Sequence, residues 1–216
     1  MTDAPARKGM LLVLSSPSGA GKTTLSRKLF EHMCVQNGED DMVMSVSITT
    51  RSRRPAEKEG VDYFFVNVPT FHQMAGEAKL LEHAKVFDNY YGTPADFVQN
   101  HIASGTDVLF DIDWQGTKQL KEKCPTDLVS IFILPPTMAE LRRRLLARDQ
   151  DSAEVINSRM DKAALEISHW TEYDYVLVND SLDTTLERII DIVNIEREKR
   201  LRQNWLPSFV DGLVKE

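Results

Sequence analysis

Short, mainly apolar runs alternate along this chain with longer stretches of mixed polarity. Four runs have the length and continuity of strands buried on both faces: residues 10–14, 107–110, 128–134 and 175–178. Each is followed by a stretch in which apolar residues recur every three or four positions, which is the spacing of a helix with one buried face. These helical stretches are residues 24–36, 114–123, 137–148 and 182–204. The alternation predicts an α/β fold, in which helices cover a parallel sheet.

Residues 45–97 have a different pattern, rich in strands with short connections. The elements expected in and around this region are strands over 42–49, 61–66 and 80–86, a helix over 70–76, and a turn at 88–94 that begins a helix running to about residue 104. Short connections favour antiparallel pairing, so we expect an antiparallel insert within the α/β core. A further helix is expected over residues 153–170, after a break at 150–152.

Composition narrows the class of protein. The 216 residues suffice for one compact α/β domain with inserts, or for two small domains. The net charge of −7 argues against a general nucleic-acid binder, because affinity for a phosphate backbone requires a basic face. Cys34 and Cys124 lack metal-site spacing, which favours a reducing compartment. The first apolar run is too short for a signal peptide or a membrane span, so we expect a cytoplasmic protein without a membrane partner.

The first apolar run leads through the sequence SPSGAGKT into the first predicted helix, which is the strand–loop–helix order of a phosphate-binding loop. The loop N–H groups and the positive end of the helix face one small volume, which suits a polyphosphate. Gly19 and Gly21 let the backbone curl around the anion. Lys22 is placed to reach the β- and γ-phosphates, and the Thr23 hydroxyl to ligate Mg²⁺. The strict pattern has Gly where this chain has Ser16, and a plain Gly-rich turn is the alternative interpretation.

Charged side chains gather at two places near this loop in the predicted fold. Asp111 and Asp113 follow the second buried strand, where a carboxylate beside bound phosphates can hold Mg²⁺ or its water. The alternative is a solvated strand end. A polar loop carries Arg51, Arg53 and Arg54, whose guanidinium groups suit a second phosphate clamp. A solvated charge run is the alternative there.

A third group of charges is the set of arginines in the helical segment after residue 136: Arg142, Arg143, Arg144, Arg148 and Arg159. Most are expected at the surface. One or two can close over the phosphates as a lid and neutralise charge during phosphoryl transfer.

Ordered short motifs run from about residue 10 to residue 204. They are PSGAGKT at 17–23, SITTRSRRP at 47–55 followed by Glu57 and Asp62-Tyr63, Leu81-Glu82, NYYGT at 89–93, DIDWQG at 111–116 and Val178-Asn179-Asp180. Together they closely resemble the guanylate kinase family, whose members transfer phosphate from ATP to GMP. The resemblance implies a P-loop NTPase-type core (1–44, 98–135 and 170–216), a GMP-binding insert (45–97) and a helical lid (136–169).

The resemblance also implies roles for individual positions. The expected ATP-binding residues are Ser16, Pro17, Ser18, Gly19, Ala20, Gly21, Lys22, Thr23, Thr24 and, beside the adenine, Asn179. The expected GMP-binding residues are Ser47, Arg51, Arg54, Tyr63, Glu82, Tyr91, Thr93 and Asp113. Catalysis is assigned to Lys22, Arg51 and the lid residues Arg148 and Arg159, and Mg²⁺ to Thr23 and Asp111.

One carboxylate can tell guanine from adenine. Guanine presents N1–H and N2–H₂ side by side as donors, whereas adenine presents an acceptor at N1, and such a site rejects the mismatch by roughly 10⁴-fold. The resemblance gives Glu82 this role, with Thr93 toward the guanine O6, for GMP and also dGMP. The acceptor phosphate is already an anion, so no catalytic base is needed. Positioning, charge neutralisation and closure of the insert and lid are expected to drive catalysis.

Two other functions stay open at this point. A non-catalytic binding module of the same family could lose Lys22 or the lid arginines, whereas this chain has them all. A kinase for another nucleoside monophosphate would need a different base-reading residue at position 82. The sequence also leaves open a homo-oligomer, the preference between GMP and dGMP, any regulation, and the role of the tail from Trp205 onward.

Overall fold

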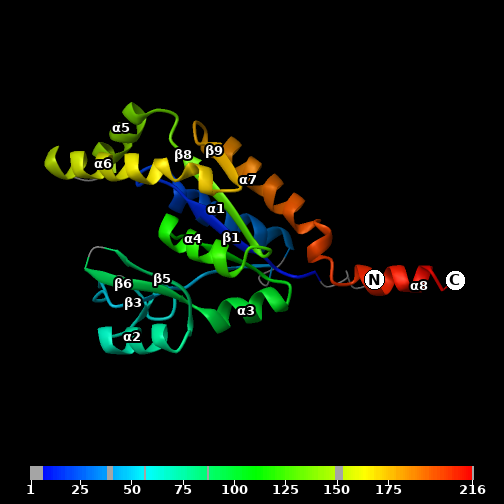
Figure 1. Ribbon diagram of the computed structural model, residues 1–216. Helices are drawn as coiled ribbons and strands as arrows, with labels where there is room; N and C mark the ends of the chain where they lie inside the picture. Colours follow the sequence, from blue (N-terminus) through cyan, green and yellow to red (C-terminus); the bar gives the residue numbers. More distant parts are fainter. Residues whose placement is uncertain (1–6, 38–40, 56, 87, 149–152, 216) are drawn as a thin grey trace.

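A computed structural model of the chain describes residues 7–37, 41–55, 57–86, 88–148 and 153–215, with the side chains at 37, 148 and 153–155 outside the description. Its larger sheet has five parallel strands in the order β2-β7-β1-β8-β9. They are β1 (Leu11–Ser15), β2 (Met42–Met44), β7 (Asp107–Phe110), β8 (Leu128–Leu134) and β9 (Tyr175–Val178). The four buried runs of the sequence are therefore the four strands on one side of β2, and the predicted α/β fold is confirmed (Figure 1).

Both faces of this sheet are covered by helices. Leu12 and Leu14 of β1 pack in one cluster with α1 (Lys22–Asn37) and α7 (Leu182–Arg197). Leu11 and Val13 point to the opposite face and pack with α3 (Ala95–Ala103) and α4 (Trp114–Lys123). Because successive side chains of a strand point to opposite faces, a strand covered on both sides is apolar at successive positions, as β1 is from Leu11 to Leu14.

A second sheet has four strands in the order β4-β3-β6-β5. They are β3 (Ile48–Thr49), β4 (Phe64–Phe65), β5 (Leu80–Val86) and β6 (Asn89–Pro94), with α2 (Val68–Gly76) packed on them through Phe71. β3 pairs parallel with β4, and the other pairs are antiparallel. The edge strand β5 is tied to α4, because the side chain of Gln119 hydrogen-bonds the backbone N–H and C=O of His83 at 3.1 and 2.7 Å.

Two helices lie over the phosphate loop. α5 (Met138–Arg148) and α6 (Ala153–Ser168) follow β8, and a short 3₁₀ turn, η1 (Trp170–Glu172), leads from α6 into β9. Leu141, Leu145 and Ala163 of these helices are buried against Ala20 of the loop. These helices therefore rest directly on the loop that follows β1 (Figure 1).

The two sheets are joined by short stretches of chain. Residues 45–47 alone separate β2 of the larger sheet from β3 of the second sheet, and β6 ends at Pro94, where α3 begins with Ala95. Ala95, Val98 and Ile102 bury α3 in the core of the larger sheet. Among the described residues, no helix is both long and apolar enough to cross a membrane.

Four sequence predictions are corrected by the structure. The strand predicted over 42–49 is divided into β2 and β3, which belong to different sheets, and the strand predicted over 61–66 is reduced to Phe64–Phe65. The turn predicted at 88–94 is the strand β6, in which Gly92 allows a close approach: a Cβ there would lie 2.9 Å from the Glu82 carbonyl oxygen.

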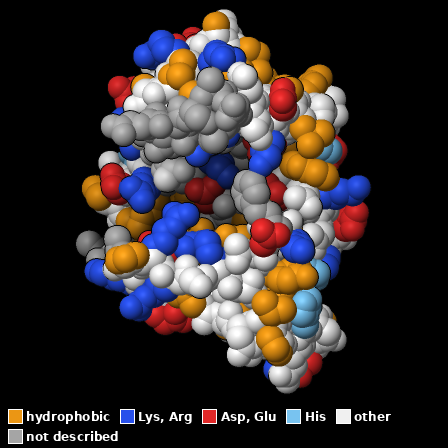
Figure 2. All heavy atoms as spheres, turned by 90° about the vertical axis from the view of Figure 1, so that its left-hand side faces the viewer, with side chains coloured by type: hydrophobic (Ala, Val, Ile, Leu, Met, Phe, Trp, Pro, Cys, Tyr) orange, Lys and Arg blue, Asp and Glu red, His pale blue; other side chains and the backbone are white. Residues whose placement is uncertain are grey.

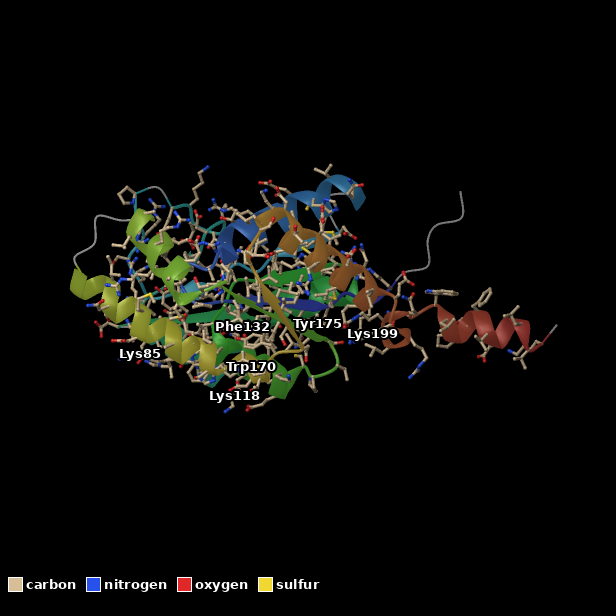
Figure 3. The ribbon with its side chains drawn as sticks, turned by 90° about the horizontal axis from the view of Figure 1, so that it is seen from above. Lys85, Lys118, Phe132, Trp170, Tyr175 and Lys199 are labelled. Carbon is tan, nitrogen blue, oxygen red and sulfur yellow. The ribbon has the colours of Figure 1, made fainter. Side chains whose placement is uncertain are left out.

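The fourth correction concerns the last helix, predicted over 182–204. α7 ends at Arg197, because Lys199 has extended backbone angles (φ −58°, ψ 133°), and a 3₁₀ turn, η2 (Arg200–Arg202), follows. There Arg202 is buried and its Nε donates to the Glu196 carbonyl, which stabilises the end of α7. The chain then forms α8 (Leu206–Leu213), which extends from the body beyond Lys199 (Figure 3).

Candidate active site

The phosphate loop is built between the end of β1 and the start of α1. Gly19 and Gly21 have φ of +91° and +104°, a region that favours glycine, and α1 begins at Lys22. A cavity of about 270 Å³ opens at the loop. Its walls are Ser16, Pro17, Ser18, Gly19, Gly21, Lys22, Thr23, Asp111 and Glu166. The conformation is therefore that of a loop folded around a small space, with Ser16 accommodated in its wall.

Asn179 supports the backbone of this loop through a side-chain hydrogen bond. Its side chain is 2% exposed, and its Nδ2 donates to the Ala20 carbonyl oxygen at 2.7 Å. A Cβ on Gly21 would lie 2.5 Å from the same nitrogen, so Gly21 and Asn179 fit together only because position 21 has no side chain. Asn179 also lines a cavity shared with Thr24, Arg144 and other residues. The predicted adenine contact of Asn179 stays a prediction, and its direct contact is with the loop.

Lys22 forms an ion pair with Asp111, with Nζ and Oδ1 2.5 Å apart. Asp111 follows β7, and both Asp111 and Thr23 line two cavities, one at the phosphate loop and a larger one toward the second sheet. Mg²⁺ in phosphoryl-transfer enzymes takes one or two protein oxygens and completes its ligands with water and phosphate. The hydroxyl of Thr23 and the carboxylate of Asp111 have the chemistry for this role.

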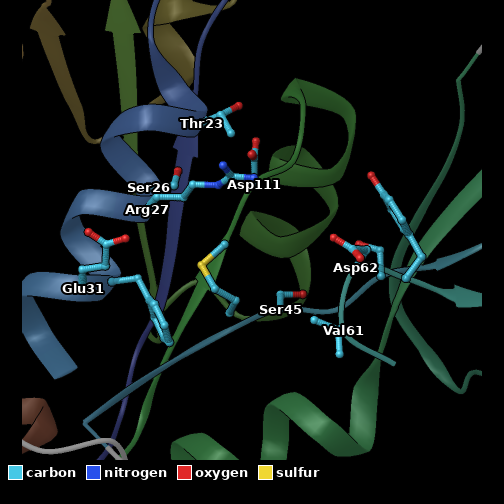
Figure 4. A pocket seen from close by; sticks show the side chains of 12 residues that line it. Thr23, Ser26, Arg27, Glu31, Ser45, Val61, Asp62 and Asp111 are labelled. Atoms are coloured by element: carbon cyan, nitrogen blue, oxygen red, sulfur yellow. The ribbon is translucent and has the colours of Figure 1, made fainter. Parts of the chain in front are cut away.

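The larger cavity, about 360 Å³, extends from the phosphate loop to the second sheet. Thr23 and Asp111 lie at one end of it, and Ser47, Asp62 and Tyr63 at the other. Figure 4 shows Thr23 and Asp111 across the space from Asp62. Figure 2 shows the same side of the molecule as a hollow with blue Lys and Arg side chains gathered around red acidic ones. One cavity is therefore bounded both by residues predicted to bind ATP or Mg²⁺ and by residues predicted to bind GMP.

Arg51 is held at the second sheet by a carboxylate and aromatic rings. Its Nη1 and Nη2 donate to Glu57 at 3.1 and 2.6 Å, and its guanidinium lies 5.3 Å from the centre of the Tyr63 ring. Glu57 raises the pKa of Arg51, and Tyr91 adds to this effect. Arg54 is exposed, and its backbone N–H donates to the same Glu57 carboxylate at 2.8 Å. Both predicted phosphate-clamp arginines are thus organised around Glu57.

Glu82 lies on β5 of the second sheet and is buried next to Gly116 of α4. Its side chain is 4% exposed and accepts a hydrogen bond from Thr93 Oγ1 at 2.7 Å. Burial raises the pKa of Glu82 to about 7, and the nearby charge of Asp113 acts in the same direction, whereas Thr93 and Lys123 oppose it. A Cβ on Gly116 would lie 2.8 Å from Glu82 Oε2, so the small residue makes room for the carboxylate.

Asp113 has a structural role as well as a predicted one. It caps α4, because its Oδ1 accepts from the backbone N–H groups of Gln115 and Gly116 at 3.0 and 3.2 Å. A carboxylate at a helix N-terminus is also favoured by the helix dipole. The predicted GMP contact of Asp113 therefore belongs to a side chain whose position is fixed by α4.

The lid arginines are described only in part. Arg159 lies on α6, is partly exposed and has an interaction partner. Arg148 ends α5, and its side chain lies outside the described residues. Arg144 points at the loop region instead: its Nη2 donates to the Asn179 carbonyl at 3.3 Å, and its Nε to Glu140 at 2.8 Å.

Three contributions at the site were not predicted from the sequence. They are the carboxylate of Glu57 on Arg51, the support of the loop by Asn179, and the presence of Glu166 in the loop cavity. Glu57 stands within the motif after residue 47, which was the available signal. Glu166 carries no such signal, because it is one polar residue on an amphipathic helix.

The comparisons with known proteins agree with one another. A family model described as guanylate kinase matches residues 8–196. The chain is 53% identical over 208 residues to a guanylate kinase of Paramagnetospirillum magneticum, covering 96% of this chain and 94% of the relative. It is 54% identical over 215 residues to a guanylate kinase of Rhodospirillum rubrum, covering 98% and 96%.

A solved structure is similar over nearly the whole chain. The crystal structure of guanylate kinase from Anaplasma phagocytophilum has a TM-score of 0.77 and 38% sequence identity, and the match covers 96% of each chain. Fold and sequence thus lead to the same family.

Proposed function

The chain belongs to the guanylate kinase family, and on that premise we propose how its residues divide the work of the ATP:GMP phosphotransfer that it catalyses. The terminal phosphoryl group of ATP passes to the phosphate of GMP, giving ADP and GDP. The observation that supports the division best is the single cavity bounded by Thr23 and Asp111 on one side and by Ser47 and Tyr63 on the other. Transfer requires two nucleotides to meet in one space.

On the donor side, the phosphate loop receives ATP. Its N–H groups and the N-terminus of α1 favour anionic oxygens, and Lys22 neutralises charge on the β- and γ-phosphates. The Thr23 hydroxyl and the Asp111 carboxylate would hold Mg²⁺, which neutralises phosphate charge when bound. Lys22 then exchanges the Asp111 carboxylate for phosphate oxygens, since both anions compete for one ammonium group.

On the acceptor side, Arg51 and Arg54 hold the phosphate of GMP with Tyr63 and Tyr91 beside them. Paired N–H donors in a fixed plane suit phosphate oxygens. Glu82, as a carboxylate, accepts from guanine N1–H and N2–H₂, and Thr93 fixes its orientation through the bond at 2.7 Å. Ser47 and Asp113 complete this half. Since none of these contacts involves the 2′-hydroxyl, dGMP is included as an acceptor.

The mobile parts in this proposal are the insert at 45–97 and the lid at 136–169, which close on the core formed by 1–44, 98–135 and 170–216. Closure excludes water from the transferring phosphoryl group and brings Arg159 and Arg148 between the two nucleotides. No base is required, because the GMP phosphate is already anionic. Small-angle scattering checks this idea: we expect compaction when both nucleotides are bound, and an unchanged radius of gyration would contradict closure.

A coupled assay of ADP formation tests the substrate assignment. With ATP as donor, we expect turnover with GMP and dGMP, and at least roughly 10³-fold lower kcat/KM with AMP, CMP or UMP. Turnover with AMP and none with GMP would overturn the acceptor assignment. No turnover with any of the five would leave only the binding module.

Two variants test the roles. Lys22→Ala should lose about 10²-fold or more in kcat, because a preorganised positive charge at the phosphates is removed. Glu82→Gln should lose mainly affinity for GMP. Lys28→Ala is the matched control for Lys22, since it removes an exposed lysine of the same helix that pairs with Asp183. The proposed setting is the cytoplasm, supported by Cys34 and Cys124, which do not form a disulfide.

A further inference from the structure

An acidic side chain of the lid lies in the cavity of the phosphate loop. Glu166 belongs to α6, yet it lines the same cavity as Ser18, Lys22 and Thr23. Its Oε2 is buried and has no hydrogen-bond partner among the described residues. A carboxylate in a space suited to polyphosphate is unexpected on charge alone, because it repels the ligand that the loop attracts. Its position therefore calls for a physical reason.

The surroundings of Glu166 have opposing effects on the charge of its carboxyl group. The backbone N–H of Ser18 and the positive charges of Lys22 and Lys162 lower the pKa of the Glu166 carboxyl group. Burial, the largest effect, and the charge of Asp113 act in the opposite direction, so that the pKa of Glu166 is raised. Two of the groups that favour the carboxylate, the Ser18 N–H and the Lys22 ammonium, therefore belong to the phosphate loop whose cavity Glu166 lines.

A second contact fixes the same end of α6. His169 lies three residues after Glu166, on the same side of the helix, and its ring stacks on Trp114 with ring centres 3.8 Å apart and an angle of 9° between the planes. His169 Nδ1 lies 2.7 Å from Glu172 Oε1, which orients the ring. Trp114 is the first residue of α4, directly after Asp113. The C-terminal end of α6 is therefore held at both the phosphate loop and α4, while Arg159 lies nearer its other end.

We propose that Glu166 is a positioning residue, which links the lid helix α6 to the phosphate loop by accepting from the Ser18 backbone N–H beside Lys22. The link has two effects. It orients the loop at the position where the phosphates of ATP enter, and it fixes the end of the helix about which the lid, with Arg159, turns as it closes. The inference rests on the proposed donor role of the phosphate loop.

Three variants test this role: Glu166→Ala, Glu166→Gln and, as a matched control, Asp161→Ala. Asp161 is an exposed carboxylate on the same helix and does not line the loop cavity. Each variant is measured for kcat, for the KM of ATP and of GMP, for GMP binding by calorimetry, and for thermal unfolding. The KM values separate a role at the donor loop from general damage to the fold.

We expect Glu166→Ala to lower kcat/KM for ATP by about 10- to 100-fold, because small misplacements of a catalytic loop have effects of this size. GMP binding should stay within about twofold of wild type. Glu166→Gln should recover most of the loss, because its amide oxygen can still accept from Ser18 N–H, and Asp161→Ala should match wild type.

Wild-type kinetics in Glu166→Ala would overturn the inference, as would an equal loss of GMP binding, or a Gln variant as impaired as the Ala variant. If Glu166→Ala does not fold, the isosteric Gln variant decides: an unchanged KM for ATP supports the hydrogen-bond role, and a tenfold rise contradicts it. The proposed function is tested separately, by whether the wild-type chain forms ADP from ATP and GMP. The variants test only the role of Glu166.

Discussion

Both oxygens of the Glu57 carboxylate accept hydrogen bonds from the Arg51 guanidinium, at 2.6 and 3.1 Å, and one of them also accepts from the Arg54 backbone N–H. The guanidinium lowers the pKa of Glu57 and so keeps it ionised. This pairing uses the Nη1–Nη2 edge of the Arg51 guanidinium and fixes the plane of the group. Glu57 is therefore expected to prepare Arg51 for a phosphate.

Replacing Glu57 by Ala should raise the KM for GMP about tenfold, because Arg51 then has to be immobilised at the moment of binding. The KM for ATP should not change. Steady-state kinetics with each substrate varied in turn makes the measurement. Glu77→Ala is the control, since Glu77 pairs with Lys79 on the same insert, away from the clamp. A lower KM for GMP in the Glu57 variant would mean that Glu57 competes with the phosphate.

The pH dependence of GMP use should report Glu82, whose pKa is raised to about 7 by burial. Guanine requires the carboxylate form, so kcat/KM for GMP should fall about tenfold per pH unit below 7. The fall should be absent in Glu82→Gln, whose remaining activity should be flat between pH 5 and 8. An unchanged profile in that variant would assign the titration to another group.

Glu82 should also affect stability, with a defined sign. Its pKa is 4.5 as a reference and about 7 in the folded protein, so the folded state binds the proton more tightly. The stabilisation from this group is complete below pH 4.5 and is lost as the pH rises to 7. At pH 8, Glu82→Gln should therefore be more stable than wild type, by on the order of 3 kcal/mol at most, and similar at pH 4.5. Urea unfolding at both pH values measures the difference.

Among the described residues, only Thr93 donates a hydrogen bond to the Glu82 side chain. Thr93→Val removes this donor without changing the shape, so the pKa of Glu82 should rise further and GMP affinity at pH 7 should fall about 10- to 100-fold. Thr93→Ser keeps the hydroxyl and should remain near wild type. Calorimetric titration with GMP compares the two. Equal affinities in both variants would show that the hydroxyl has no role in orienting Glu82.

Asn179 has two candidate roles, support of the phosphate loop and contact with adenine, and one variant separates them. If it supports the loop through Ala20, Asn179→Ala should lower stability by about 1–3 kcal/mol and raise the KM of every nucleoside triphosphate donor by a similar factor. If it contacts adenine, only the preference for ATP over GTP should change. The expected result is a lower Tm with an unchanged donor preference. The two measurements together decide between the roles.

The sequence predicted best the elements whose pattern reflects burial on both faces. β1, β7, β8 and β9 were found because a central parallel strand has no polar side. The division of 42–49 could not be found, because the alternation continues unbroken while the chain passes from one sheet to the other. The sequence at 88–94 predicts a turn in place of β6, because Gly92 and Pro94 are turn formers. In the fold, Gly92 serves a close approach to β5, and Pro94 is the last residue of its strand.

The residues of the site likewise fall into those that the sequence predicts and those that it does not. Residues within motifs, such as Lys22 and Glu82, were found from the sequence, and their predicted ligands remain predictions. The support that surrounds them was not found, because Asn179 meets Ala20, and Glu166 meets the loop, only after distant segments pack. Spacing along the chain carries no information on such contacts.

The two connections between the sheets have a mechanical consequence. The second sheet is joined covalently to the larger one by residues 45–47 and by the Pro94–Ala95 junction. Both connections are short. In the proposed closure, these two short connections restrict the movement of the second sheet to a rotation about the line that joins them. A movement restricted in this way has few degrees of freedom, so little chain entropy would be lost in the proposed closure. Inserting two glycines between Val46 and Ser47 would add further degrees of freedom, and GMP would then have to restrict them on binding.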